Sequence, residues 1–168
     1  LGLWHLDETT TGGGGTGNDF QDHSGNSNWG KKQGTATLGL PGRLGNAVFF
    51  NGSSGYISTT TSYSNPTTFT VSIWFKTTTT SGGKLIGFGS SQTGLSTDYD
   101  RHIYMQNSGL LTYGVYNSGA KVISTTSSYN DGKWHHEVAT QGSSGMTFTE
   151  DGISIGTNAS TVSQSYTD

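Results

Sequence analysis

The strongest constraint on the fold is a strict alternation of apolar and polar side chains between residues 68 and 76. Every second position is apolar, a period typical of a β-strand with one buried face. The apolar set is Phe69, Val71, Ile73 and Phe75. These aromatic and β-branched types suit a packed, pleated surface. We therefore predict a central strand that turns four apolar side chains into a core and carries Trp74 on its polar face.

The rest of the chain is divided into short apolar segments by turns rich in asparagine and glycine. Between residues 84 and 124 these turns recur about every ten residues, and Asp151-Gly152 has the composition of a two-residue hairpin turn. Residues 52–55 predict a further hairpin between residues 45–51 and 56–59. No window shows helical periodicity. The pattern predicts an all-β protein, a two-sheet antiparallel β-sandwich of the jelly-roll type, with residues 1–168 forming one domain.

Composition excludes several classes of partner. The net charge of -3 gives no basic surface for nucleic acid, and no apolar run approaches the roughly 20 residues that span a bilayer. The chain has no cysteine, and only 11% of its residues are charged, so its solubility rests on Thr, Ser, Asn and Gly. This composition favours an exported protein. Because the sequence begins at Leu1, without an initiator methionine, we expect a processed or excised start.

A segment near the amino terminus is dense in oxygen donors. Asp19, Asp22 and Asn26 could converge on calcium, which prefers carboxylate and carbonyl oxygens. The spacing is not that of an EF-hand loop. The alternative is an Asx-turn in which Asp22 accepts the backbone N–H groups of Ser24 and Gly25. Both alternatives stay open, and the calcium hypothesis places the ion near Asp22, Asn26 and Asn51.

Aromatic and hydrogen-bonding side chains gather on two consecutive predicted strands, and such a mixture suits a glycan site. The candidates are Arg101, His102, Tyr104, Tyr113 and Tyr116. Trp74 is a further candidate, because an indole ring can stack on the C–H face of a sugar. Each has a structural alternative: Trp74 packing under a loop, and Arg101 pairing at the surface with Asp98 or Asp100. Strand register, which decides which side chains share a face, cannot be obtained from one sequence.

The sequence argues against catalysis. His135 and His136 are adjacent on a predicted strand and face opposite sides, so they cannot chelate one ion together, and the order His-His-Glu is not that of helical zinc proteases. Glycoside hydrolysis needs two carboxyl groups across the scissile bond. No Glu-x-Asp-x-Glu run is present, and Glu150 and Asp151 are adjacent at a turn. We therefore expect a protein that is not an enzyme.

The ordered set of motifs resembles the laminin-G-like jelly roll of the concanavalin A-like lectin/glucanase superfamily, in its bacterial extracellular branch. The resemblance rests on residues 3–8 (LWHLDE), 22–26 (DHSGN), 45–52 (GNAVFFNG), 69–77 (FTVSIWFKT), 100–105 (DRHIYM) and 132–140 (GKWHHEVAT). It implies two face-to-face antiparallel sheets, a non-catalytic role in carbohydrate or protein attachment, and often one structural calcium. Relatives usually carry apolar residues where Glu137 and Glu150 stand. They also continue beyond the point where this chain stops.

The resemblance leads to two functional expectations. The first is an extracellular or cell-surface recognition module that binds carbohydrate or a cell-surface protein. The alternative is a structural subunit of a surface assembly. If terminal strands are lacking, a sheet edge is left open, and a neighbouring subunit could complete it by strand addition.

Overall fold

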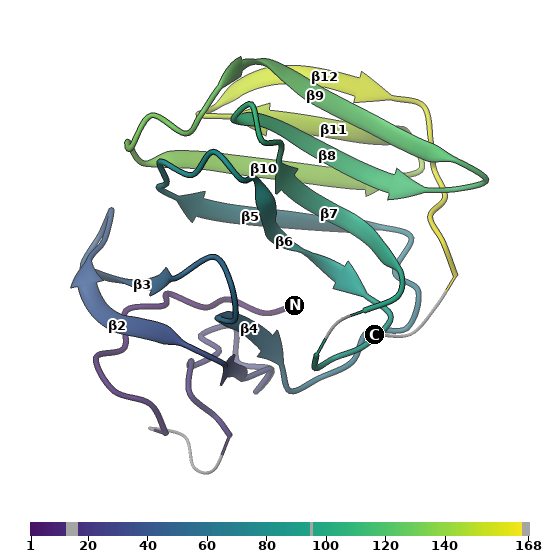
Figure 1. Cartoon of the computed structure of the whole chain (residues 1–168). Coiled ribbons are helices and arrows are strands. Elements are labelled where there is room, and N and C mark those ends of the chain that lie inside the picture. Colours follow the sequence, from purple (N-terminus) through teal and green to yellow (C-terminus); the bar gives the residue numbers. More distant parts are fainter. Residues whose placement is uncertain (13–16, 95, 166–168) are drawn as a thin grey trace. The chain divides into compact units, whose positions relative to one another are not determined.

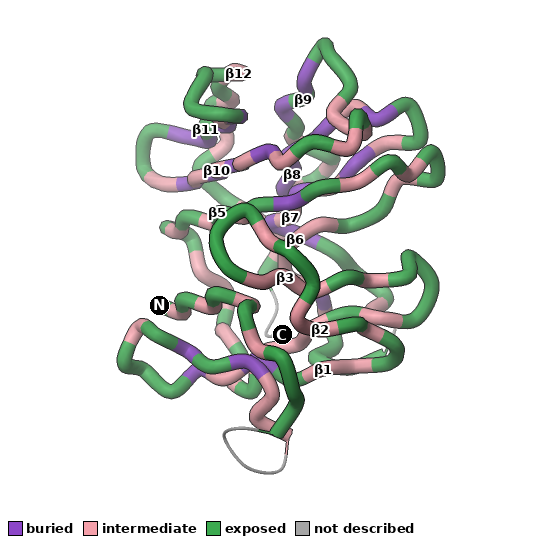
Figure 2. The backbone as a smooth tube through the Cα atoms, turned by 90° about the vertical axis from the view of Figure 1, so that its left-hand side faces the viewer, coloured by how far each residue is buried: buried purple, intermediate pink, exposed green. Residues whose placement is uncertain are grey.

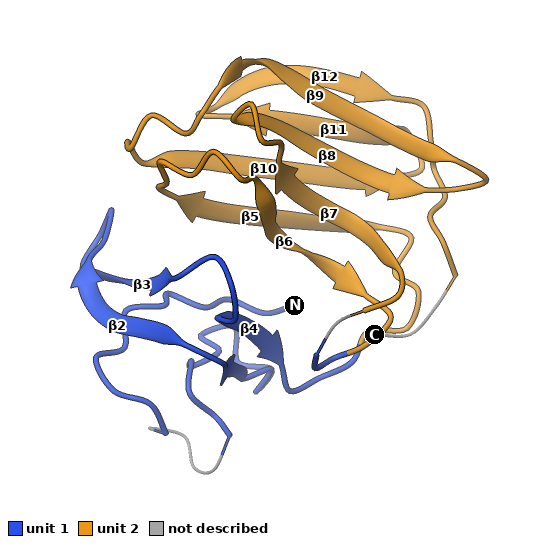
Figure 3. Ribbon diagram, in the orientation of Figure 1, with its two compact units in different colours: residues 1–62, 92–95 blue, residues 63–91, 96–168 orange. Residues whose placement is uncertain are grey.

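The computed structural model describes residues 1–12, 17–94 and 96–165. Within these residues the regular secondary structure consists of twelve β-strands. Contacts divide the chain into two compact units, Leu1–Ser62 with Gln92–Leu95 and Tyr63–Ser91 with Ser96–Asp168 (Figure 3). Whether the whole chain behaves as one domain stays a prediction. In its described part, the structure has no helix of the length and apolarity that crossing a bilayer requires.

The second unit is a sandwich of two antiparallel four-stranded sheets (Figure 1). One sheet has the order β12 (Ile153–Asn158), β11 (Gly145–Glu150), β10 (His135–Gly142) and β5 (Phe69–Phe75). The other has the order β6 (Gly83–Gly89), β7 (Tyr99–Met105), β8 (Leu110–Tyr116) and β9 (Ala120–Ser128). This architecture confirms the all-β, two-sheet antiparallel prediction.

The core lies between these two sheets and takes side chains from both. One sheet contributes Phe75, Ala139, Met146 and Phe148; the other contributes Ile103, Met105, Leu111, Tyr113, Val115 and Ile123. The rings of Tyr113 and Phe148 meet across the layers with centroids 6.1 Å apart. Buried positions alternate with half-buried ones along the whole of β10 (Figure 2). Full burial of one such side chain contributes about 1.5–3 kcal/mol to folding.

The alternation seen in the sequence at β5 is confirmed. Phe69, Val71, Ile73 and Phe75 are buried or half-buried, and the residues between them are exposed. The predicted central position is wrong, because β5 lies at one end of its sheet, beside β10. Strand β10 pairs with β5 on one side and β11 on the other. The inward face of β10 carries His135 and Glu137, so the strand is less apolar than is usual for a strand with neighbours on both sides.

Turn chemistry was predicted well for one hairpin and poorly for another. Asp151 and Gly152 have φ values of 47° and 81°, the left-handed pair that joins β11 to β12. The hairpin expected around residues 52–55 is wrong in its pairing. In the first unit β3 (Asn46–Phe50) pairs with β2 (Ala36–Pro41), and β4 (Tyr56–Thr59) pairs with β1 (Gly30–Gln33). Asn51 accepts the N–H groups of the following turn, which leads the chain to a different partner.

Candidate functional site: a hollow on the β6–β9 sheet

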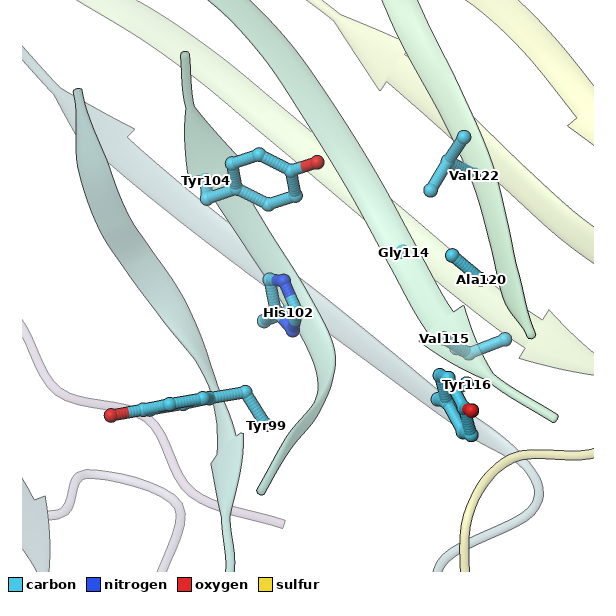
Figure 4. A pocket seen from close by; sticks show the side chains of 8 residues that line it. All are labelled: Tyr99, His102, Tyr104, Gly114, Val115, Tyr116, Ala120 and Val122. Carbon is cyan, nitrogen blue, oxygen red and sulfur yellow. The ribbon is translucent and has the colours of Figure 1, made fainter. Parts of the chain in front are cut away.

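A hollow of about 220 Å³ lies on the outer face of the β6–β7–β8–β9 sheet (Figure 4). The side chains of β7 alternate there, with Ile103 and Met105 in the core and His102 and Tyr104 on the opposite face. The lining residues are Tyr99, His102, Tyr104, Gly114, Val115, Tyr116, Ala120 and Val122. All belong to the second unit.

Strand register explains why this face is hollow. His102 on β7 lies opposite Gly114 on β8, which lies opposite Val122 on β9. Gly114 has no side chain, so its backbone forms the floor of the hollow between the side chains of His102 and Val122. A Cβ atom at Gly114 would lie 3.3 Å from Cγ1 of Val122, which is close contact. The depth of the hollow therefore depends on glycine at this position.

The walls are largely aromatic and remain accessible to solvent. Tyr99 and Tyr116 are 45% and 49% exposed, and Tyr104 is half-buried. The His102 and Tyr104 rings lie 5.1 Å apart at an angle of 44°, and the Lys84 ammonium group lies 5.2 Å from the Tyr99 ring centre. Aromatic faces combined with a few polar groups suit a flat ligand that has apolar C–H surface and hydroxyl groups.

His102 is held in its neutral form at the wall of the hollow. Burial disfavours the imidazolium, and the positive charge of Lys84 adds to this effect, so the pKa of His102 lies below its ordinary value. A neutral imidazole offers one donor and one acceptor nitrogen. His102 can therefore exchange hydrogen bonds with a hydroxyl group without bringing a charge to the site.

The structure separates the predicted ligand-binding residues into three groups. His102 and Tyr104 line the hollow, together with Tyr116. Arg101 and Tyr113 are fully buried, so their side chains lie away from it. Trp74 is 45% exposed on the other sheet, where it stacks on His136 with ring centroids 4.8 Å apart.

Arg101 follows the alternation of β7 and is buried on the same face as Ile103 and Met105. Asp100 departs from the alternation, because it is buried as well, next to the left-handed backbone of Arg101, whose φ is 48°. The guanidinium pairs with Asp100 at 3.2 Å and donates to the Pro66 carbonyl at 2.8 Å. Arg101 thus connects segments inside the protein and does not contact a ligand in the hollow.

Sequence reasoning missed two residues that line the hollow, Tyr99 and Gly114. A tyrosine at the end of a strand and a glycine within a strand indicate no binding role until the strand register is known.

The predicted calcium ligands lie in the first unit, where the side-chain oxygens of Asp22 and Asn51 accept hydrogen bonds from protein donors. Asp22 accepts the backbone N–H groups of Leu3, Ser24 and Asn28, at 2.9, 2.9 and 2.8 Å. Desolvation works against it, but these hydrogen bonds and one from the Ser24 hydroxyl lower the pKa of Asp22 below its ordinary value. Asn26 donates to the Leu1 carbonyl. The Asx-turn at Ser24 is present, and calcium stays a prediction.

The acids that bear on the question of catalysis are Glu137 and Glu150. They are direct partners across β10 and β11, yet they are 0% and 2% exposed. Neither belongs to the lining of the hollow. A glycosidase must place its two carboxyl groups on either side of a bound sugar, and a sugar cannot approach groups enclosed to this degree.

Comparison with known proteins places the fold. No curated protein matches the sequence significantly. The crystal structure of an S-layer domain-containing protein from Clostridium thermocellum is similar, with a TM-score of 0.56 and 22% sequence identity. The match covers 97% of this chain and 73% of that one. The family model described as concanavalin A-like lectin/glucanases superfamily matches residues 51–168. This match spans well over half of the sequence, so the chain belongs to the laminin G family of the concanavalin A-like lectin/glucanases superfamily.

Proposed function

We propose that this domain is a non-catalytic extracellular recognition module that binds one carbohydrate ring in the hollow of the β6–β9 sheet. The observation that carries the proposal is the combination of a glycine floor at Gly114 with aromatic walls at Tyr104 and Tyr116. Family membership supports an extracellular module. The assignment of carbohydrate rests on the chemistry of the lining.

The size of the hollow limits the ligand. Its volume of about 220 Å³ is below the range of roughly 300–1,000 Å³ of typical small-molecule pockets. A single terminal or branching sugar ring fits such a space better than a long glycan chain. Stacking of that ring on Tyr104 or Tyr116 would supply apolar contact, and His102 would exchange hydrogen bonds with its hydroxyl groups.

The test is glycan binding by the purified chain, first on an array and then by calorimetry with the best ligand. Tyr104→Ala and Tyr116→Ala should each weaken binding at least tenfold. Trp74→Ala is the matched control, because it removes a similarly exposed aromatic side chain from the other sheet. Loss of binding in the Trp74 variant alone would move the site to that sheet and overturn the proposal. Hydrolysis of a β-glucan by the wild-type chain would contradict the non-catalytic assignment.

A second candidate is a structural subunit of a surface assembly. Strands β5 and β6 each lie at an end of their sheets, where an added strand from another subunit could pair. The similar solved structure is, by its printed description, an S-layer domain-containing protein. Light scattering across a concentration series distinguishes the two candidates. Growth of the particle with concentration supports assembly, and a constant monomer mass supports the recognition module.

A further inference from the structure

A second group of functional side chains lies at the rim of the sandwich, where β10 begins and β11 ends. It consists of His135, Glu150 and Asp151, whose ligand atoms all lie within 4.8 Å of one another. The His135 Nδ1 atom is 2.9 Å from Oδ2 of Asp151 and 3.3 Å from Oε1 of Glu150. Donors around a tetrahedral zinc ion with bonds of about 2.0–2.1 Å lie roughly 3.3 Å apart. The distance between Nδ1 and Glu150 Oε1 therefore already matches the spacing of metal ligands, whereas the distance between Nδ1 and Asp151 Oδ2 is that of a hydrogen bond.

The second observation is Glu137, which lies on the same face of β10 as His135 and directly opposite Glu150 on β11. Glu137 is 0% exposed, and within the described residues neither of its carboxylate oxygens has a hydrogen-bond partner. Oε1 of Glu150 is likewise buried without a hydrogen bond there, and its printed contact is the ion pair with Nδ1 of His135 at 3.3 Å. Buried polar groups in proteins are nearly always satisfied, and each exception requires an explanation such as a missing ion.

The surroundings orient the imidazole as a metal ligand requires. The Nε2 atom of His135 is 3.0 Å from Oδ1 of Asp131, and Nδ1 is 2.9 Å from Oδ2 of Asp151. A metal ion at Nδ1 requires the tautomer that carries its proton on Nε2 and donates it to Asp131. Ligating histidines usually donate their other nitrogen to a carboxylate in this manner. The Tyr129 ring packs edge-on against the imidazole at 5.0 Å and limits its rotation.

We propose that His135, Glu150 and Asp151 bind one divalent transition-metal ion, for which zinc is the best match, and that Glu137, which lies outside this group of three, turns toward the ion as the fourth ligand. One imidazole and three carboxylates form a small mixed nitrogen and oxygen set that suits zinc better than calcium, which takes six to eight oxygens. The ion neutralises the facing acids and joins β10 to the β11–β12 hairpin. Asp151, exposed at the turn, gives the ion a path from solvent.

The experiment uses the full chain, stripped with a chelator, dialysed, and titrated with zinc chloride in a calorimeter. One ion per chain and a higher melting temperature are expected, and calcium chloride or magnesium chloride should have neither effect. Cobalt chloride should give the intense visible absorption of a four-coordinate site, which zinc then abolishes. Failure of zinc and cobalt to bind, or equal stabilisation by calcium, would overturn the proposal.

Variants locate the ion. Glu137→Gln and Glu150→Gln keep the shape of the side chains and should abolish the cobalt spectrum, and Asp131→Asn should weaken zinc binding about 10–100-fold. His136→Gln is the matched control for His135→Gln, since His136 is the adjacent histidine on the other face and bonds to Ser72. If His135→Gln fails to fold, Glu137→Gln and Glu150→Gln test whether these residues bind the ion. Zinc affinity unchanged in both, or lost in His136→Gln, would contradict the assignment.

Discussion

Asp100 and Arg101, consecutive residues of β7, form an ion pair of 3.2 Å in which both side chains are fully buried. Asp100 also accepts the backbone N–H groups of Tyr116 and Gln164, at 2.7 and 2.6 Å. Arg101 donates to the side-chain oxygen of Asn65 and to the carbonyl of Gln164. One charged pair thus holds β7, β8, the segment before β5 and the segment after β12 in a single network.

Breaking this network is expected to be costly. Arg101→Met should lower the free energy of unfolding by about 3–5 kcal/mol, because it leaves the Asp100 carboxylate buried without its cation. Urea denaturation measures the change. Lys133→Met is the control, since it removes the exposed pair with Asp131, which should cost at most about 1 kcal/mol. If both substitutions lowered the free energy of unfolding equally, the buried ion pair would contribute no more to stability than the exposed one, against this prediction.

Filling the floor of the hollow should reduce ligand binding without unfolding the domain. Gly114→Ala adds a Cβ atom 3.3 Å from Val122 Cγ1, and the methyl group occupies space that the ligand needs. We expect a tenfold or greater loss of glycan affinity, about 1.4 kcal/mol, with a melting temperature close to that of the wild type. Unchanged affinity would show that the ligand does not reach the floor.

The depressed pKa of His102 predicts a dependence of stability on pH. The unfolded chain takes up a proton near pH 6.5, while the folded chain does so only at lower pH. The unfolded state therefore binds more protons between these two values, and stability falls as pH is lowered through that window. The melting temperature should therefore fall between pH 7.5 and pH 5. A smaller fall in the His102→Gln variant would assign the effect to His102 and not to the other histidines.

The unsatisfied acid on β10 predicts a stabilising substitution. In chelator-treated protein, Glu137→Leu should raise the free energy of unfolding by about 1–3 kcal/mol, because a buried carboxyl without partners is replaced by an apolar side chain. The same substitution should remove zinc binding. Chemical denaturation with and without zinc measures both effects. A less stable Leu variant in the absence of metal would indicate that Glu137 has a partner, such as an ordered water molecule.

The melting temperature distinguishes the calcium hypothesis from the Asx-turn at Asp22. If hydrogen bonds alone hold the turn, a calcium chelator leaves the melting temperature unchanged. Asp22→Asn then lowers the melting temperature, because the amide nitrogen cannot accept a hydrogen bond. A fall in melting temperature with chelator that calcium alone reverses would establish the ion. Asn51→Ala serves as a comparison, because Asn51 was predicted to be a calcium ligand and also accepts backbone N–H groups.

Features determined by neighbouring residues could be predicted from the sequence. The alternation at β5 and the turn at Asp151-Gly152 depend on contacts within a few residues, and both are present. The position of β5 depends on pairing with β10, more than 60 residues later. The sequence pattern did not reveal that β10, and not β5, lies inside the sheet. Two inward positions of β10 are the polar residues His135 and Glu137, so β10 lacks the apolar alternation of an inner strand.

The candidate site was predicted in part for the same reason. His102 and Tyr104 follow the alternation and line the hollow. Arg101 follows the same alternation but lies on the buried face with Ile103 and Met105, and one sequence does not tell which of the two faces is buried. The rim cluster was missed, since His135 and Glu150 meet only through the pairing of β10 with β11. The sequence alone does not show that residues on two different strands lie close together, because that depends on how the strands pair.

The glycine at position 114 has an evolutionary consequence. Its neighbours in the hollow, such as Ala120 and Val122, also stand on the outer face of the sheet, so exchanging them does not disturb the packed interior. Duplicated copies of such a domain could diverge in ligand preference one methyl group at a time, each intermediate remaining folded.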